Sequence, residues 1–383
     1  MEVYQALAAK LDTFPTGAPK TEHLLKILET LFTEQEAGIA SQLSIQPFRE
    51  KLSTLSERVG MSAEALKPVL ETLADKGLAF ARAKDGEMAY SLLPLVPGIF
   101  ELQFMKAGYD PKSRALAKLF NDYYFAGWGE ASFGFKTSFT RTIPIEKAVA
   151  PGQSIEPYRN VKEIIENSKY LALTNCFCRH EHELLGNSCK KPKEVCMVFG
   201  PFVEHAIARG FARKTSKQEM LDKLLLSEEA GLVHITDNIR DKISFICNCC
   251  GCCCGFLSAI NKLNLPSVVA NSGFVIAINE DLCDNCGRCA QRCQIKALWV
   301  EDNPDRPVRK ERKEQKDLTG KKVPKKLLKR NLGRCIGCGL CVSVCKQNAI
   351  IMVRRPENQV VIPRETFEEL GLELMKERNE RGR

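Results

Sequence analysis

The sequence has no long apolar run and no nucleotide-binding loop. Every apolar stretch is shorter than the roughly eighteen residues that a membrane helix needs, and Met1–Gln5 carries neither the basic nor the apolar part of a secretory signal. No Gly-x-x-x-x-Gly-Lys-Ser/Thr or Gly-x-Gly-x-x-Gly loop follows a candidate strand. We therefore expect a cytoplasmic protein that has no membrane span and no nicotinamide, flavin or ATP site.

Excess positive charge is missing from most of the chain. The formal net charge is +9, but the segment 306–334 alone holds 13 Lys/Arg against 3 Asp/Glu, so the remainder is close to neutral. Residues 1–150 contain 17 Lys/Arg and 18 Asp/Glu. Nucleic-acid binding depends on clustered positive charge that neutralises phosphates. The charge distribution therefore argues against nucleic acid as the partner.

Cysteine, in contrast, is abundant, with eighteen in the chain. The cysteines are clustered at metal-ligand spacings, and directly adjacent cysteines make poor disulfide partners. A reducing cytosol keeps thiolates available to bind a metal. We therefore interpret the cysteines as metal ligands rather than as disulfides, in a protein from an organism that handles little oxygen.

Two segments near the C-terminus share the spacing C-x2-C-x2-C-x3-C. They are Cys283–Cys293 and Cys335–Cys345, and in each an alanine follows the last cysteine by four residues. Apolar, strand-like runs come next, at Leu298–Val300 and Ile350–Val353. This internal repeat closely resembles a bacterial-type two-cluster [4Fe–4S] ferredoxin module.

The resemblance implies two cubane clusters that exchange one ligand, because the fourth cysteine of each repeat binds the cluster of the other repeat. Zinc is the disfavoured alternative, since zinc sites usually use separated C-x2-C pairs. The chain departs from the family pattern at Gln294 and Lys346, where a proline usually follows the fourth cysteine. The implied ligands are Cys283, Cys286, Cys289 and Cys345 for the first cluster, and Cys335, Cys338, Cys341 and Cys293 for the second.

Ten further cysteines lie between residues 176 and 254, and six of them fall within eight consecutive residues. Packing does not explain this density, because free thiols are reactive unless a soft metal holds them as thiolates. They leave room for one or two more clusters. A helix would place Cys247, Cys250 and Cys254 on one face, whereas an extended segment would align Cys250, Cys252 and Cys254, so the ligand sets stay open. The candidates are Cys176, Cys178, Cys189, Cys196, Cys247, Cys249, Cys250, Cys252, Cys253 and Cys254.

Together, the Cys-x-Cys-Arg start at Cys176, the later cysteine burst and the C-terminal repeat resemble multidomain ferredoxin-like proteins of strict anaerobes. The two Cys-Cys-Gly triplets at 249–251 and 253–255 also resemble the motif of heterodisulfide-reductase-type catalytic subunits, although the long spacings of that family are missing. His180 and His182 follow the first cysteines, and we interpret them as surface residues rather than as ligands.

The first 105 residues have the pattern of a winged helix-turn-helix. Apolar periodicity predicts helices over Glu22–Phe32, Leu52–Val59 and Ala63–Lys76, and Asp85-Gly86 marks a hairpin. The second helix of such a unit would read DNA. Its candidate exposed face has mixed charge, which favours docking or dimerisation over DNA binding. That face comprises Glu64, Lys67, Pro68, Glu71, Thr72 and Lys76.

We predict an α+β multidomain fold with an N-terminal winged-helix-like domain, a Cys-rich α/β middle domain and a C-terminal ferredoxin-like domain. The Tyr- and Phe-rich stretch near Trp128 is interpreted as a packed linker, with shielding of clusters from water as the alternative. Glu365–Arg378 is interpreted as a helix that covers the ferredoxin-like domain. The predicted boundaries are 1–105, 106–270, 271–363 with a basic insert at 306–334, and 364–383.

The first functional hypothesis is an iron–sulfur electron-transfer protein, or the electron-transfer subunit of an anaerobic oxidoreductase. A redox-responsive DNA-binding regulator is one alternative, and a reductase with a catalytic cluster in the Cys-rich middle region is another. The basic insert 306–334 is either a solvated excursion, the favoured interpretation, or a docking surface for an acidic redox partner.

Overall fold

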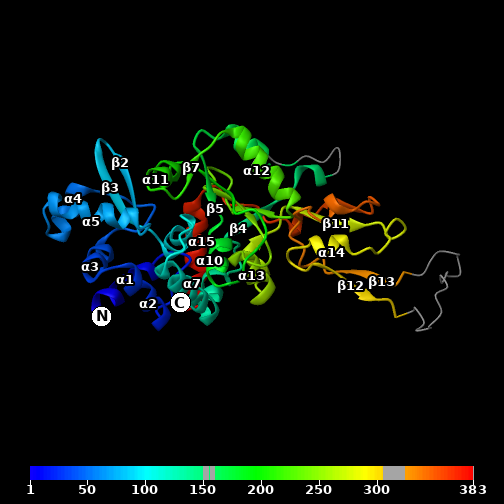
Figure 1. The fold of residues 1–383 in the computed structure, drawn as a ribbon, viewed down its shortest axis with the longest axis horizontal. Helices are drawn as coiled ribbons and strands as arrows, with labels where there is room; N and C mark the ends of the chain where they lie inside the picture. The colour runs from blue at the N-terminus through cyan, green and yellow to red at the C-terminus, as the bar shows by residue number, and fades with distance from the viewer. Residues whose placement is uncertain (150–154, 156–159, 305–323, 383) are drawn as a thin grey trace.

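The computed structural model describes residues 1–149, 155, 160–304 and 324–382. In these residues the fold is mixed α/β with four sheets. Figure 1 shows the N-terminal part (blue to cyan) at one end, a large sheet (green) in the middle and the cysteine repeats (yellow to orange) at the other end. The mixed α/β class is confirmed, whereas the four domain boundaries stay predictions.

The N-terminal part contains the helices and the hairpin that the sequence predicts. In α2 (Glu22–Leu31), four leucine and isoleucine side chains of one face are buried, and the Thr21 side chain caps the first turn. The hairpin joins β2 (Ala79–Lys84) to β3 (Glu87–Leu92) through Asp85 and Gly86, which both have positive φ. The other elements are α1 (Glu2–Asp12), α3 (Glu34–Gln42), β1 (Glu50–Lys51), α4 (Leu52–Val59), α5 (Ala63–Asp75), α6 (Phe100–Met105), α7 (Pro111–Tyr123) and α8 (Gly129–Phe133).

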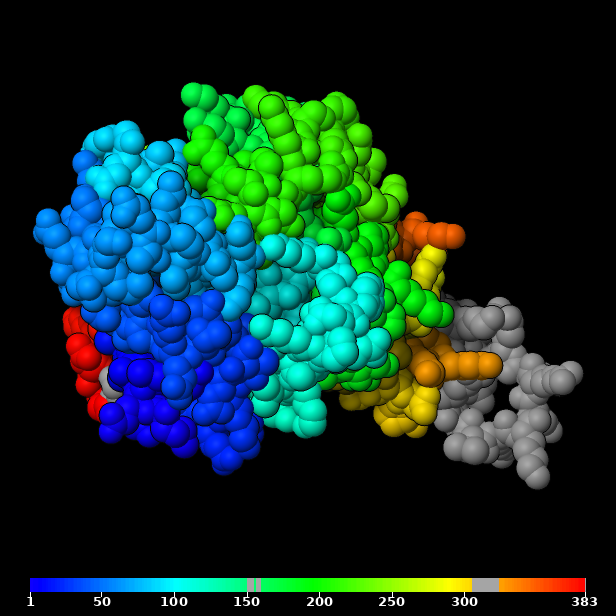
Figure 2. All heavy atoms as spheres, turned by 60° about the vertical axis from the view of Figure 1, so that its left-hand side comes forward, coloured from blue at the N-terminus to red at the C-terminus, as the bar shows by residue number. Residues whose placement is uncertain are grey.

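The helix α5 is held against the middle of the chain. Arg209, which follows α11 (Phe202–Ala208), donates to Glu71 at 2.5 Å and to Asp75 at 2.6 Å. A Cβ at Gly77 would come within 2.7 Å of Leu102 and 3.0 Å of Phe211, so the chain turns there in close contact with both. Figure 2 shows the blue and green surfaces adjoining along this border. These contacts favour the docking interpretation of α5.

The central sheet has seven strands in the order β10-β4-β8-β9-β6-β5-β7, and every neighbouring pair is antiparallel except β10 and β4. Alternation along β6 and β9 separates two faces: Met197 and Ile246 join one apolar core cluster, whereas Cys196 and Cys247 join another. The elements are β4 (Thr140–Ile143), α9 (Val161–Asn167), β5 (Leu171–Asn175), α10 (Phe177–Leu184), β6 (Glu194–Phe199), β7 (Arg213–Lys214), α12 (Lys217–Glu229), β8 (Val233–Asp237), β9 (Phe245–Cys249), α13 (Gly255–Lys262) and β10 (Val269–Ala270).

The cysteine repeats are framed by two antiparallel strand pairs. β11 (Phe274–Ile278) pairs with β14 (Ile350–Arg354), and β12 (Leu298–Asp302) pairs with β13 (Lys326–Arg330). A short helix, α14 (Arg288–Arg292), contains Cys289, the third cysteine of the first repeat. Residues 306–323 of the basic insert lie outside the described residues. At the described end of the insert, β13 is held in register by β12.

The C-terminal helix α15 (Phe367–Glu380) packs on the central sheet rather than on the cysteine repeats, which corrects the expectation from the sequence. Leu370 and Leu374 are buried in the same apolar cluster as Met197 and Ile246. Arg378 forms an ion pair with Asp12 at 2.6 Å, so the helix also ties the N-terminal part to the sheet.

Within the described ranges, no helix is long and apolar enough to span a membrane.

Candidate metal centres

The repeat cysteines of the first predicted cluster lie around one pocket. Cys283, Cys286 and Cys289 come from the first repeat, and Cys345 reaches the same pocket from the end of the second. Arg288 donates to the Cys286 sulfur at 3.4 Å. The structure therefore brings together the four residues that the resemblance implies.

The second predicted set also comes together. Cys338 and Cys341 lie close enough to Cys335 and Cys293 for the four sulfur atoms to interact electrostatically. Gly337 is required in this loop, because a Cβ there would lie 2.3 Å from the Phe274 carbonyl oxygen. Burial raises the pKa of Cys338 to about 12, so a bound metal would have to displace the proton.

The two repeats share the details of their fourth cysteine loop. The backbone N–H of Ala297 donates to the Cys293 sulfur at 3.2 Å, and that of Ala349 donates to the Cys345 sulfur at 3.3 Å. Hydrogen bonds to sulfur stabilise the thiolate and tune the potential of a bound cluster. The two repeats therefore share the cysteine spacing and also the hydrogen bond that the fourth cysteine sulfur accepts.

The ten central cysteines divide into a set of six and a set of four. The six-cysteine ring is buried, and each of its thiols interacts with two others, so that the six form a closed ring. Its members come from the N-terminus of α10, from β6 and β9, and from the start of α13. The six-cysteine ring comprises Cys176, Cys178, Cys254, Cys249, Cys247 and Cys196, in the order of contact.

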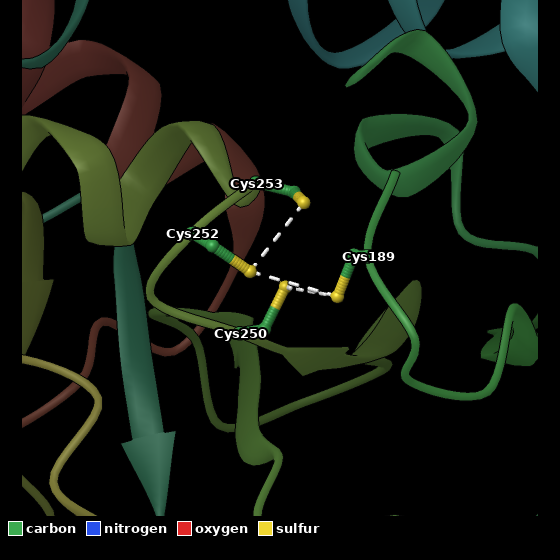
Figure 3. Close-up of side chains that lie close together, drawn as sticks. All are labelled: Cys189, Cys250, Cys252 and Cys253. Carbon is green, nitrogen blue, oxygen red and sulfur yellow. Dashed lines mark hydrogen bonds between the residues drawn. The ribbon is translucent and has the colours of Figure 1, made fainter. Parts of the chain in front are cut away.

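The four-cysteine set lies nearer the surface. Cys250, Cys252 and Cys253 belong to the turn between β9 and α13, and Cys189 approaches from the loop after α10 (Figure 3). Cys252 is exposed, whereas Cys250 and Cys253 are buried. Neither a continuous helix nor a continuous extended segment describes residues 247–254, because β9 ends at Cys249 and a turn follows. The helix and the extended segment that the sequence left open therefore each fail to describe all eight residues.

Arg179 lies between these two sets. It is 1% exposed, and its Nη1 donates to the Asn248 carbonyl oxygen at 3.0 Å and to the Cys250 sulfur at 3.8 Å. Its Nε and Nη2 are buried without a hydrogen-bond partner among the described residues. A buried cation with free donors suits an anionic iron–sulfur cluster, which offers sulfur acceptors and negative charge. The residues present therefore fit the group that the sequence implies.

The histidines next to the first cysteines are not surface residues, which corrects the interpretation from the sequence. His180 is 1% exposed, and its Nε2 lies 2.8 Å from the Gly108 carbonyl oxygen. His182 is partly buried, with its Nδ1 3.2 Å from the Cys178 carbonyl oxygen. His205 and His234 are also buried, and they contact the backbone of Ala81 and the side chain of Asn248, respectively.

The aromatic stretch interpreted as a linker forms a wall of the six-cysteine ring. Tyr124 and Trp128 line the pocket that contains Cys178 and Cys254, and the Tyr124 hydroxyl donates to the Gly255 carbonyl oxygen at 2.8 Å. Two buried carboxyl groups line the same pocket. Burial raises the pKa of Glu101 to about 7 and the pKa of Glu181 to about 8. The wall excludes water from the buried thiols.

A direct contact joins the central cysteines to the end of the first repeat. The Gln294 side chain accepts a hydrogen bond from the Gly251 backbone N–H at 2.8 Å, and Asn261 donates to the Gln294 carbonyl oxygen at 2.9 Å. Gln294 occupies the position where a proline usually follows the fourth cysteine. The residue that replaces this proline therefore binds the loop of Cys293 to the turn at Gly251.

An apolar cavity of about 420 Å³ lies between the N-terminal part and the six-cysteine ring. Cys196 and Cys247 lie in its wall, along with aromatic side chains such as Phe80 and Phe177. Arg49 and Gln46 contribute polar groups, and the Gln46 Nε2 has no hydrogen-bond partner within the described part of the chain.

The comparisons with known proteins match the C-terminal repeats. A family model described as a 4Fe-4S dicluster domain matches residues 282–350. A curated protein described as putative ferredoxin-3, from Sinorhizobium fredii, is 30% identical over 77 residues, which cover 20% of this chain and 73% of that protein. No solved structure matches the chain. Through its C-terminal repeats, the chain belongs to the two-cluster 4Fe-4S ferredoxin family.

Proposed function

We propose that this chain is an iron–sulfur electron-transfer protein, or the electron-transfer subunit of an anaerobic oxidoreductase complex. Bound clusters supply one-electron redox chemistry. The chain holds them by thiolates, with Cys283, Cys286, Cys289 and Cys345 in one set and Cys335, Cys338, Cys341 and Cys293 in the other. A further cluster is assigned to the six-cysteine ring, where four thiols would serve as ligands and two would remain.

The contact between Gln294 and Gly251 carries this proposal. It places the loop of Cys293 directly against the turn that follows Cys249, so the second ferredoxin set and the central cysteines are neighbours. Arg334 strengthens the junction by donating to the Asn261 side-chain oxygen at 3.3 Å as well as to the Ile295 carbonyl oxygen at 3.0 Å. Electron transfer requires short separations between redox centres, and hydrogen bonds between side chains and backbone hold these two loops together.

Iron and acid-labile sulfide per chain test the proposal. Two ferredoxin clusters require about eight irons and eight sulfides, and a cluster in the six-cysteine ring raises each number to about twelve. The protein must be purified without oxygen. Fewer than about eight irons per folded chain, with sulfide equally low, would contradict the function.

The partner is proposed to be an acidic redox protein that docks at β13. Lys325, Lys326 and Arg330 are exposed on this strand and its approach, and Leu328 of the same strand lines the pocket of the first cysteine set. Steering by such charges raises association rates and weakens with salt. Electron transfer to an acidic acceptor should therefore slow as salt rises, and a rate independent of salt would contradict this docking site.

A second function, a reductase with its catalytic centre at the central cysteines, is favoured by the apolar cavity. The cavity is large enough for a small organic molecule, and it reaches Cys196 and Cys247 of the six-cysteine ring. Cavity filling by Leu102→Trp would abolish turnover of such a substrate while electron transfer through the ferredoxin sets continues. Unchanged turnover in that variant would remove the cavity from the mechanism.

The DNA-binding hypothesis stays a prediction. The structure gives α5 an internal partner in Arg209, and the exposed side chains of α5 include both Glu64 and Lys67. Measurement of duplex DNA binding at low salt tests it directly, and absence of any binding would remove it.

A further inference from the structure

The four-cysteine set is more compact than the other cysteine sets. The Sγ atoms of Cys189, Cys250, Cys252 and Cys253 all lie within 4.8 Å of one another. Individual separations are 3.6 Å between Cys189 and Cys252, 3.5 Å between Cys252 and Cys253, and 4.0 Å between Cys189 and Cys250. Figure 3 shows the four sulfur atoms turned toward one another from two separate segments.

These separations distinguish a single metal ion from a cubane. Four thiolates around one tetrahedral ion, with metal–sulfur bonds of about 2.3 Å, lie about 3.8 Å apart. The four thiolates of a cubane lie roughly 6 Å apart, because each binds a different iron atom at a different corner. The observed separations match the first arrangement and are too short for the second.

The ferredoxin repeats serve as a control within the same chain. Among the described residues, no other group of three or more Cys, His, Asp or Glu ligand atoms is as compact as the four-cysteine set. The cysteines with cubane spacing in the sequence are therefore wider apart than these four. The compactness is specific to this site and is not a general property of the cysteines.

We propose that Cys189, Cys250, Cys252 and Cys253 hold one tetrahedral ion of a soft metal, zinc or iron, separate from any cluster. The inference deepens the proposed function, since it assigns four of the central cysteines to a mononuclear site. Thiolates are soft ligands that select zinc and iron in tetrahedral geometry. Four protein ligands also close the coordination sphere, which is typical of structural or electron-transfer sites rather than of substrate-binding metals.

The surroundings fit such a site. Four thiolates and a divalent ion carry a net charge of about −2, and two nearby cations offset it. Arg179 donates to Cys250 at 3.8 Å, and Lys262 lines the cavity next to Cys252 and Cys253. That cavity, of about 340 Å³, also contacts Cys189 and gives an ion a path to the sulfurs. The four thiols release their protons as the ion binds.

The double variant Cys189→Ser/Cys252→Ser tests the inference in the full chain, purified without oxygen. Cys286→Ser, in the first ferredoxin set, is the matched control, because Cys286 is exposed like Cys252. Iron, zinc and acid-labile sulfide are measured per chain in each protein. The double variant should lose about one zinc or iron ion and no sulfide. The control should lose about four irons and four sulfides.

Two results would overturn the mononuclear site. Loss of about four irons and four sulfides from the double variant would show a cubane, and unchanged metal content would show that these cysteines bind nothing. A control that loses nothing would instead contradict the ferredoxin sets, so the two failures are distinguishable.

If the double variant does not fold, the wild-type chain carries the test. X-ray absorption at the zinc edge, or Mössbauer spectroscopy for iron, should show one ion per chain bound by four sulfurs at about 2.3 Å without a neighbouring metal. Absence of such an ion from both measurements would overturn the inference.

Discussion

Replacement of Gly251 by alanine is expected to separate the central cysteines from the Cys293 loop, which ends the first repeat and belongs to the second predicted cysteine set. A Cβ at position 251 would lie 2.1 Å from the Gln294 carbonyl oxygen and 3.0 Å from its carbonyl carbon, and both atoms belong to backbone that cannot rotate away. The φ of Gly251 is not in the left-handed region, so the effect is steric. The contact must open.

Two costs add at this junction. Overpacking of a fitted contact costs about 1–3 kcal/mol. The hydrogen bond from the Gly251 N–H to Gln294, now 2.8 Å long, is also lost, at about 1 kcal/mol. We therefore expect Gly251→Ala to lower the free energy of unfolding by about 2–4 kcal/mol, and to slow electron transfer between the ferredoxin sets and the six-cysteine ring.

The assay combines anaerobic denaturant unfolding with rapid-mixing reduction followed by absorbance. Iron and sulfide are counted first, so that a slow rate is not the result of a missing cluster. Gly38→Ala is the control, because a Cβ at Gly38 has no atom within 4 Å and the residue lies in α3. A Gly251→Ala protein with full iron content, wild-type stability and wild-type rate would refute the reasoning.

Three further predictions concern other parts of the chain. Burial raises the folded-state pKa of Glu101 from 4.5 to about 7, so the folded chain keeps a proton that the unfolded chain releases. The free energy of unfolding should therefore fall by about 3 kcal/mol as pH rises from 4.5 to above 7. Glu101→Gln should therefore gain stability relative to wild type as pH rises through 7 in anaerobic urea unfolding, and a constant difference would contradict the assigned pKa. Cys345→Ser should remove the cluster of Cys283, Cys286 and Cys289 while the second set keeps its cluster; EPR that shows the second set lost instead would disprove the exchange of ligands. Arg209→Ala should destabilise the contact between α5 and the middle of the chain by about 1–3 kcal/mol and should raise the hydrogen-exchange rate of α5. Arg58→Ala is the control, because its partner Glu50 lies within the N-terminal part and the contact of α5 stays intact.

The sequence could predict the two ferredoxin sets because the spacing of their cysteines is local, and the structure places the cysteines of the first set around one pocket. Three cysteines of each predicted set come from one repeat, and only Cys293 and Cys345 lie near the cysteines of the other repeat. Helical periodicity and the Asp85-Gly86 turn likewise predicted α2, α5 and the hairpin. These signals depend on residues within a few positions of one another.

The central cysteines could not be divided from the sequence, because their grouping depends on strand order. Cys196 joins Cys176 and Cys247 only because β6 lies between β5 and β9 in the sheet. Cys189 joins Cys252 only because the loop after α10 reaches the turn at the end of β9. No local pattern encodes these neighbours.

Several functional residues were missed for the same reason. The position of Arg179 directly after Cys178 indicates a positive charge near the thiols. Its burial, however, depends on contact with Asn248 of β9, which is distant in the sequence. Gln294 stands where a proline is usual, but its partner Gly251 lies 43 residues away in the sequence. The charged residues beside His180 and His182 in the sequence favour surface positions, whereas the fold buries His180 with its Nε2 against the Gly108 carbonyl oxygen.

The central claim is that two repeats exchange one cysteine and hold two clusters side by side. EPR of the fully reduced chain, prepared without oxygen, tests it most directly. The account predicts the broadened signal of two interacting paramagnetic clusters from the residues 282–350 that match the dicluster family. A folded chain that is colourless, gives no signal on reduction and contains zinc at these cysteines would contradict it.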